Sequence, residues 1–167
     1  MKNLLLPLFF LPLVASAQNK SDGYLVLRGG ISPKSDAVKG VAFISVGVSK
    51  KKEVGFGLGV GYIDYDRPYI PLTVDISFFG TKNKISPIVI GQAGYGVYNN
   101  DRTGITIRGA FTGSLNAGVA FPMKSKRVFL TAGAMSNGFV TTTKIGSVTQ
   151  KNSSNDTRFV ATFGVVL

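Results

Sequence analysis

Residues 105–121 alternate between two kinds of side chain with a period of two. One face is mainly apolar and carries Ile105, Ile107, Phe111, Leu115, Ala117, Val119 and Phe121. The other face is small or polar and carries Thr106, Arg108, Ala110, Thr112, Ser114, Asn116, Gly118 and Ala120. Because successive side chains of a β-strand point to opposite faces, this pattern predicts one long strand with an apolar face.

The same alternation recurs along the chain and predicts eight strands. Their ranges are 24–32, 40–49, 54–62, 70–78, 86–98, 105–121, 128–137 and 158–167. Short turns follow the second, fourth and sixth strands, so that pairing of neighbours places these turns and both termini at one end, the turn end. The other connections, including a long polar loop over 137–156, lie at the opposite end, the loop end. An even strand count with this asymmetry predicts an all-β, antiparallel, up-and-down transmembrane barrel.

The side on which the apolar face lies decides between a membrane barrel and a soluble one. An eight-stranded barrel has a lumen only just wide enough for side chains, so bulky Phe, Leu and Ile fit better outside, against lipid. Aromatic residues gather near the strand ends, which indicates two interfacial belts. The loop-end group is Tyr62, Tyr65, Tyr69, Tyr95 and Tyr98, and the turn-end group is Phe56, Phe78, Phe79, Phe121 and Phe129.

The N-terminus has the three parts of a secretory signal peptide. Lys2 supplies the positive region, 4–14 is apolar, and Ala15-Ser16-Ala17 is a small-residue cleavage site. We therefore expect a cleaved signal peptide over 1–17 and a barrel domain over 18–167. No later stretch offers the roughly 18 consecutive apolar residues of a membrane-spanning helix.

Together with this signal peptide, the glycine-aromatic strand 54–62 (VGFGLGVGY), the stretch 86–98 (SPIVIGQAGYGVY) and the alternating C-terminus resemble small outer-membrane barrels of the OmpA/OmpX type. The nearest resemblance is to the Bacteroidota-like, porin-like outer membrane protein β-barrel domain. It implies export to the outer membrane of a Gram-negative bacterium, with outer-membrane lipids and the barrel-assembly machinery as partners. The chain departs from the pattern in ending on Leu167, where such barrels usually have an aromatic residue.

The inner face is expected to hold a polar network. Strand parity places six polar side chains there: Arg28, Asp75, Gln92, Arg108, Asn116 and Arg158. An isolated buried charge is costly, so we expect Asp75 to pair with Arg108 or Arg158. Such a network either stiffens the barrel as a packed core or forms a selectivity ring or small proton path.

The net charge of +11 collects at the turn end. The basic residues of the three short turns are Lys50, Lys51, Lys52, Lys82, Lys84, Lys124, Lys126 and Arg127. We expect them to meet anionic headgroups of the inner leaflet, with simple solvation of the turns as the alternative. No stacking platform or reading helix accompanies the charge, so nucleic acid is not an expected partner.

The composition argues against catalysis. The chain contains no His and no Cys, which removes the usual bases, thiolate nucleophiles and zinc ligands. We expect no catalytic residues, no metal and no cofactor. The expected role is structural or a surface interaction through the loops, chiefly 137–156. The alternatives are a narrow porin-like channel for small solutes and a secreted soluble barrel that binds an apolar ligand.

Overall fold

The computed structural model describes residues 21–34, 37–50, 53–65, 67–80, 84–123 and 126–167. The expected signal peptide therefore lies outside the described residues. The strands are β1 (Ser21–Lys34), β2 (Ala37–Lys50), β3 (Val54–Asp64), β4 (Pro68–Phe78), β5 (Ser86–Val97), β6 (Asn99–Arg102), β7 (Ile105–Met123), β8 (Lys126–Ile145) and β9 (Val148–Val166). Within these ranges, no helix has the length and hydropathy needed to cross a bilayer.

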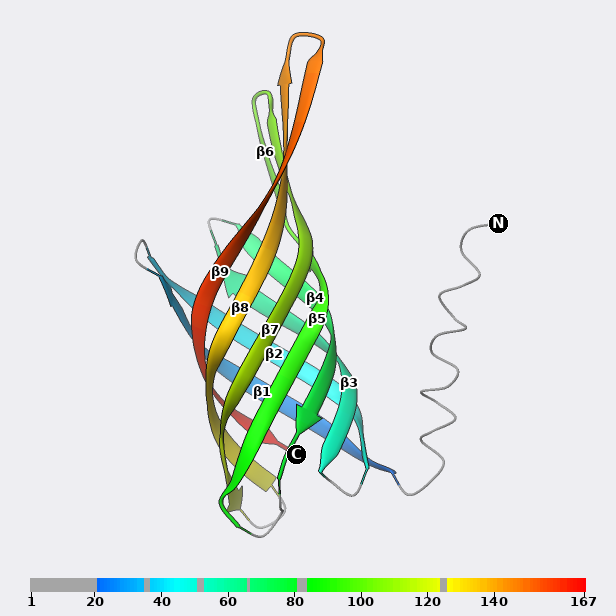
Figure 1. The fold of residues 1–167 in the computed structure, drawn as a ribbon, viewed down its shortest axis with the longest axis vertical. Helices are drawn as coiled ribbons and strands as arrows, with labels where there is room; N and C mark the ends of the chain where they lie inside the picture. Colours follow the sequence, from blue (N-terminus) through cyan, green and yellow to red (C-terminus); the bar gives the residue numbers. More distant parts are fainter. Residues whose placement is uncertain (1–20, 35–36, 51–52, 66, 81–83, 124–125) are drawn as a thin grey trace, which may run out of the picture.

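The strands form a barrel (Figure 1), and their pairing closes eight of them into a ring. Each strand pairs antiparallel with its neighbour, β5 continues to β7, and β9 closes the ring by pairing with β1. Two backbone hydrogen bonds between Leu25 and Leu167 tie the C-terminus to β1. The short β6 pairs with the upper part of β7. The predicted eight-stranded, antiparallel, up-and-down barrel is confirmed.

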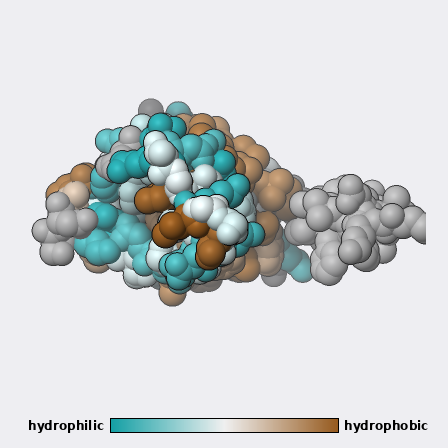
Figure 2. Space-filling view, turned by 90° about the horizontal axis from the view of Figure 1, so that it is seen from above, coloured by the Kyte–Doolittle hydropathy of each residue, from teal (hydrophilic) through white to brown (hydrophobic). Residues whose placement is uncertain are grey.

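The two faces of the wall are inverted relative to a soluble protein. Leu72, Phe111 and Leu115 point outward and are 51%, 67% and 63% exposed, whereas Asp75 and Asn116 point inward and are 0% and 1% exposed. The prediction that bulky apolar residues face outward is therefore confirmed. Seen from above in Figure 2, hydrophilic residues cover much of the loop end, and hydrophobic residues line the side of the barrel.

The predicted long loop over 137–156 is wrong, because this segment is a strand hairpin. β8 and β9 remain paired up to Ile145 and Val148, and Gly146, with a φ of 60°, begins the two-residue turn between them. Its many Thr residues have a high β-propensity, which the polar composition concealed. β3 and β4 have 11 residues each, whereas β8 has 20 and β9 has 19. The hairpin consequently rises well above the rest of the barrel (Figure 1).

A β-bulge in β7 changes which residues face inward. The pairing with β8 shifts register between Gly109 and Thr112, so the alternation is out of phase on either side of this point. Below the bulge Thr112 and Asn116 are buried, and above it Ile107 packs against the interior. Arg108 is turned outward by the same shift.

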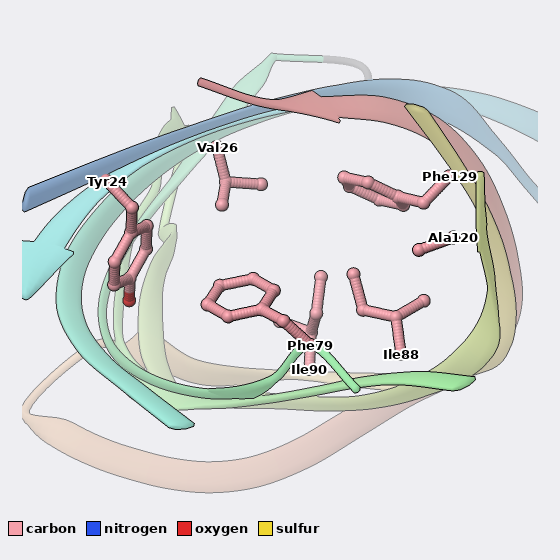
Figure 3. Close-up of a cluster of buried hydrophobic side chains, with 7 residues drawn as sticks. All are labelled: Tyr24, Val26, Phe79, Ile88, Ile90, Ala120 and Phe129. Carbon is pink, nitrogen blue, oxygen red and sulfur yellow. The ribbon is translucent and has the colours of Figure 1, made fainter. Parts of the chain in front are cut away.

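Two hydrophobic clusters fill the two ends of the lumen. The turn-end cluster, drawn in Figure 3, consists of Tyr24, Val26, Phe79, Ile88, Ile90, Ala120 and Phe129. The loop-end cluster consists of Val41, Phe43, Ile63, Tyr69, Tyr98, Met135 and Val160, with Tyr65, Ile107 and Phe139 against it. The prediction of two interfacial aromatic belts is therefore wrong for five of their residues, which point inward: Tyr65, Tyr69, Tyr98, Phe79 and Phe129. Tyr62 and Tyr95 are exposed on the outer wall, as are Phe56, Phe78 and Phe121.

Candidate functional site at the loop end of a filled barrel

A polar layer separates the two hydrophobic clusters, and Asp75 is its centre. The Asp75 carboxylate accepts hydrogen bonds from Ser45, from Thr73 Oγ1 at 2.7 Å and from Gln92 Nε2 at 2.9 Å. Three polar side chains therefore satisfy a carboxylate that is completely buried.

The layer continues along the inner wall from β5 to the neighbouring strand β7. Ser114 Oγ donates to Gln92 Oε1 at 3.0 Å, and Asn116 Nδ2 donates to Ser114 Oγ at 3.1 Å. The side chains of Gln92 and Asn116, both expected inside, are thus linked through a residue between them. Together with Asp75, they form a hydrogen-bonded chain along the inner face of the neighbouring strands β4, β5 and β7.

Arg28 is buried in the same layer. Its guanidinium lies over the ring of Phe43, 4.4 Å from the ring centroid, and the charge of Asp75 acts on it electrostatically. The negative charge of Asp75 therefore acts on Arg28 at a distance, and the expected pairing of Asp75 with Arg108 or Arg158 is wrong, because these arginines pair with Asp101 and Asp156.

Inward-facing glycines of β3 make room for this interior. A Cβ at Gly59 would lie 2.7 Å from both Asp75 Oδ2 and Thr73 Oγ1, and a Cβ at Gly61 would lie 2.4 Å from the ring of Phe43. In the strand 54–62, the bulky apolar residues thus form the outer wall, and the glycines between them leave space inside that neighbouring side chains occupy.

Arg108 is not part of the lumen. Its side chain is 44% exposed and forms an ion pair of 2.9 Å with Asp101 on β6, beside a hydrogen bond to Asn99. The bulge between Gly109 and Thr112 inverts the parity on which the prediction rested, and the sequence gives no clear signal of that bulge.

Arg158 is buried near the loop end, and its partner is Asp156. Arg158 Nε donates to Asp156 Oδ2 at 2.6 Å, and Nη1 donates to the backbone oxygen of Ala37 at 3.2 Å. The Asp156 carboxylate also accepts from Lys34 Nζ at 2.5 Å and from Tyr65 Oη at 2.7 Å. These contacts join β1, β2, β9 and the connection between β3 and β4.

Four aromatic rings close the lumen above the polar layer. Tyr65, Tyr69, Tyr98 and Phe139 contact one another in every pairing, with centroids 5.3 to 6.4 Å apart. Below this aromatic plug, a cavity of about 10 Å³ beside Gln92 and Met135 has room for about one water molecule. The rings and the polar layer thus leave little space within this part of the barrel.

Above the plug lies a hollow of about 330 Å³, which we call the vestibule. It is lined by Lys39, Tyr65, Tyr98, Ile107, Phe139, Thr141, Ser154 and Arg158. Of these, only Arg158 was among the predicted site residues. Lys39 shares the inward parity of Val41 and Phe43, so its position could have been found from the strand pattern.

The turn end differs from expectation at one residue. Lys50, Lys84 and Lys126 are exposed, whereas Lys51, Lys52, Lys82 and Lys124 lie outside the described residues. Arg127 is buried, and its Nη1 donates to the backbone oxygens of Phe79 at 2.6 Å and Gly80 at 3.4 Å. The prediction of Arg127 as a membrane-surface residue is wrong, because strand parity points it into the lumen, where it contacts the connection between β4 and β5.

Comparisons with known proteins place the fold. No protein-family model matches the sequence, and no curated protein matches it. The N-terminal β-barrel domain of Pseudomonas aeruginosa OprF is 13% identical with a TM-score of 0.53, covering 88% of this chain and 98% of that one. Outer membrane protein AlkL, whose structure was solved in DMPC bilayers, is 10% identical with a TM-score of 0.55, covering 89% of this chain and 90% of AlkL. The chain therefore has the fold of the small outer-membrane β-barrels.

Proposed function

We propose that this chain is a non-enzymatic barrel of the outer membrane of a Gram-negative bacterium, which contacts partners outside the cell through its loop end. The observation that carries the proposal is the contrast between a filled lumen and a projecting sheet. Two hydrophobic clusters, a polar layer and an aromatic plug occupy the inside, while β8 and β9 extend beyond the wall.

The apolar outer wall supports the membrane location. A transmembrane β-strand needs about 9–11 residues, and β3 and β4 have 11 each. Large apolar side chains on these strands are exposed, including Leu58, Val74 and Ile76. Lipid solvates such a surface, whereas water would not.

The length of β8 and β9 supports a role in surface contact. Their 20 and 19 residues exceed the 11 of β3 by 9 and 8, which corresponds to about 30 Å of additional strand. The ladder between β9 and β1 ends at Ala161, so the part of β9 above it forms an edge of the projecting sheet. A sheet edge presents backbone groups that can pair with another extended chain.

At the turn end, we propose that Lys50, Lys84 and Lys126 meet the anionic headgroups of the inner leaflet. All three are exposed: Lys50 is the last residue of β2, Lys84 lies shortly before β5, and Lys126 is the first residue of β8. Each basic residue near an anionic surface contributes on the order of 1 kcal/mol of attraction.

Labelling of lysines in intact cells tests the location and the orientation together. A membrane-impermeant amine reagent should modify Lys144 and Lys151, which flank the hairpin tip, in intact cells. It should reach Lys50, Lys84 and Lys126 only after the outer membrane is permeabilised. Recovery of the protein in the soluble periplasmic fraction, or the opposite labelling pattern, would overturn the proposal.

Conductance in planar bilayers tests the closed lumen. We expect no steady single-channel steps from protein whose folded state is established by a heat-dependent shift in gel mobility. Steady steps would instead support the narrow channel for small solutes.

A further inference from the structure

The vestibule combines positive charge with an aromatic floor. Tyr65, Tyr98 and Phe139 form the floor, and Lys39 and Arg158 line it from β2 and β9. Its volume of about 330 Å³ lies at the lower end of the usual range for small-molecule sites. The vestibule therefore has the size for a ligand of about one ring.

The charge around the vestibule is positive. Lys34, Lys39 and Arg158 supply three cations, and Asp156 supplies one anion, which already accepts hydrogen bonds from Lys34 and Arg158. Three minus one leaves a balance of +2. The vestibule is consequently suited to a ligand that brings a negative charge.

Lys39 is the cation most available to such a ligand. Its Nζ lies 5.5 Å from the centroid of the Tyr65 ring, and within the described ranges it has no hydrogen bond or ion pair with an acidic residue. The ammonium group of Lys39 has three N–H donors, and the Tyr65 ring alone does not satisfy them. A carboxylate over Tyr65 would accept hydrogen bonds from these donors.

The remaining lining fits the body of the ligand. Aromatic rings offer apolar faces and edges on which a flat or chair-shaped ring packs, and the hydroxyls of Thr141 and Ser154 offer hydrogen bonds beside them. Ile107 completes the apolar part of the lining only because the bulge in β7 turns it inward. The same structural feature that moves Arg108 out of the lumen thus shapes this hollow.

We infer that the vestibule binds a small organic anion in which a carboxylate is attached to a six-membered ring. Lys39 pairs with the carboxylate, while Tyr65, Tyr98 and Phe139 contact the ring. An acidic sugar and an aromatic acid share this chemistry. This inference names a ligand for the surface contact proposed above. It rests on that proposal in one respect only, namely that the vestibule opens to the outside of the cell.

Calorimetric titration of the purified, folded barrel in detergent tests the site without reference to its orientation in a cell. The probes are D-glucuronate and benzoate. The controls are D-glucose, which has a ring but no charge, and acetate, which has the carboxylate but no ring. We expect saturable binding of at least one ring acid, and binding at least about tenfold weaker for glucose and acetate. Preference for glucuronate identifies a sugar as the source, and preference for benzoate identifies an aromatic acid.

Substitution of the lysine assigns the site. Lys39→Gln should weaken the binding of the ring acid by about tenfold or more, because it removes a charge-assisted hydrogen bond. Lys144→Gln makes the same change of charge near the hairpin tip and should leave binding unaltered. Since the chain contains no Trp, the emission of its tyrosines gives a second readout of binding beside Tyr65 and Tyr98.

Three results would overturn the inference: no saturable binding of either ring acid to folded protein, equal binding of acetate, or equal affinity in Lys39→Gln. These failures are distinct from failure of the proposed function, which the labelling of intact cells decides independently.

Discussion

Tyr65 donates a hydrogen bond of 2.7 Å to Asp156, a residue that follows it by 91 positions. The same carboxylate accepts from Lys34 and Arg158, so it holds three separate elements together across the rim of the barrel. Burial on its own raises the pKa of Asp156, but the hydrogen bonds from Lys34, Arg158 and Tyr65 lower the pKa to about 2.

This carboxylate should make the loop end sensitive to acid. Its pKa in the folded protein lies below the ordinary value of 3.8, so its contribution to stability is complete above pH 3.8 and is lost as the pH falls towards 2. We expect the free energy of unfolding in detergent to decrease over this interval. Asp156→Asn should be less stable at neutral pH and should show a smaller decrease over the same interval.

A matched control for Asp156 is Asp101, whose ion pair with Arg108 is exposed. Asp101→Asn should change the free energy of unfolding by about 1 kcal/mol or less, because exposed ion pairs are weak. Equal acid sensitivity of the wild type and Asp156→Asn would contradict the assignment of this effect to Asp156.

Gly59 tests whether the glycines of β3 serve the packing of the lumen. Gly59→Ala places a Cβ 2.7 Å from Asp75 Oδ2 and Thr73 Oγ1, so either the polar layer or the strand must move. We expect a loss of about 1–3 kcal/mol in the free energy of unfolding. Gly91→Ala is the matched control, since its Cβ makes only contacts of 3.9 Å, with Ile76 and Leu115. A similar loss in both variants would point to a general effect of β-strand glycines.

The sequence allowed the wall of the barrel to be predicted well, because alternation is a local property. The outward position of a residue such as Leu115 can be read from the apolar residues two positions away. Eight segments with this alternation are enough to predict the eight-stranded ring. The signal failed where pairing continues in polar sequence. The Thr-rich end of β8 has no apolar face, so nothing in its composition separates a strand from a loop.

The candidate site could be predicted less well, because its geometry depends on contacts across the barrel. Parity alone places Asp75 and Arg158 inside, but it cannot tell that Ser45 and Asp156 are their respective partners. One bulged residue is enough to reverse the parity of Arg108, and the cost of such a bulge is too small to be visible in a single sequence.

The electrostatic coupling of Arg28 and Asp75 can be measured by a double-mutant cycle. Asp75→Asn removes the negative charge that acts on the buried guanidinium of Arg28 and weakens the hydrogen bonds from Ser45, Thr73 and Gln92, so we expect a loss of about 1–3 kcal/mol in the free energy of unfolding. Arg28→Met removes the cation while keeping an apolar stem over Phe43. The double variant should be more stable than the sum of the single losses implies, by about 0.5–3 kcal/mol. Simple additivity would show that the two groups do not interact.

The bulge in β7 can be tested with two isoleucines that lie two positions apart. Ile107 packs against the loop-end cluster because the register shift turns it inward, whereas Ile105 is exposed beyond that cluster. Ile107→Ala should therefore lower the free energy of unfolding by about 1–2 kcal/mol, and Ile105→Ala should change it by about 0.5 kcal/mol or less. The measurement is denaturant unfolding of both variants in the same detergent. Equal effects would mean that Ile107 does not pack inside, and the vestibule would then lack one side of its apolar lining.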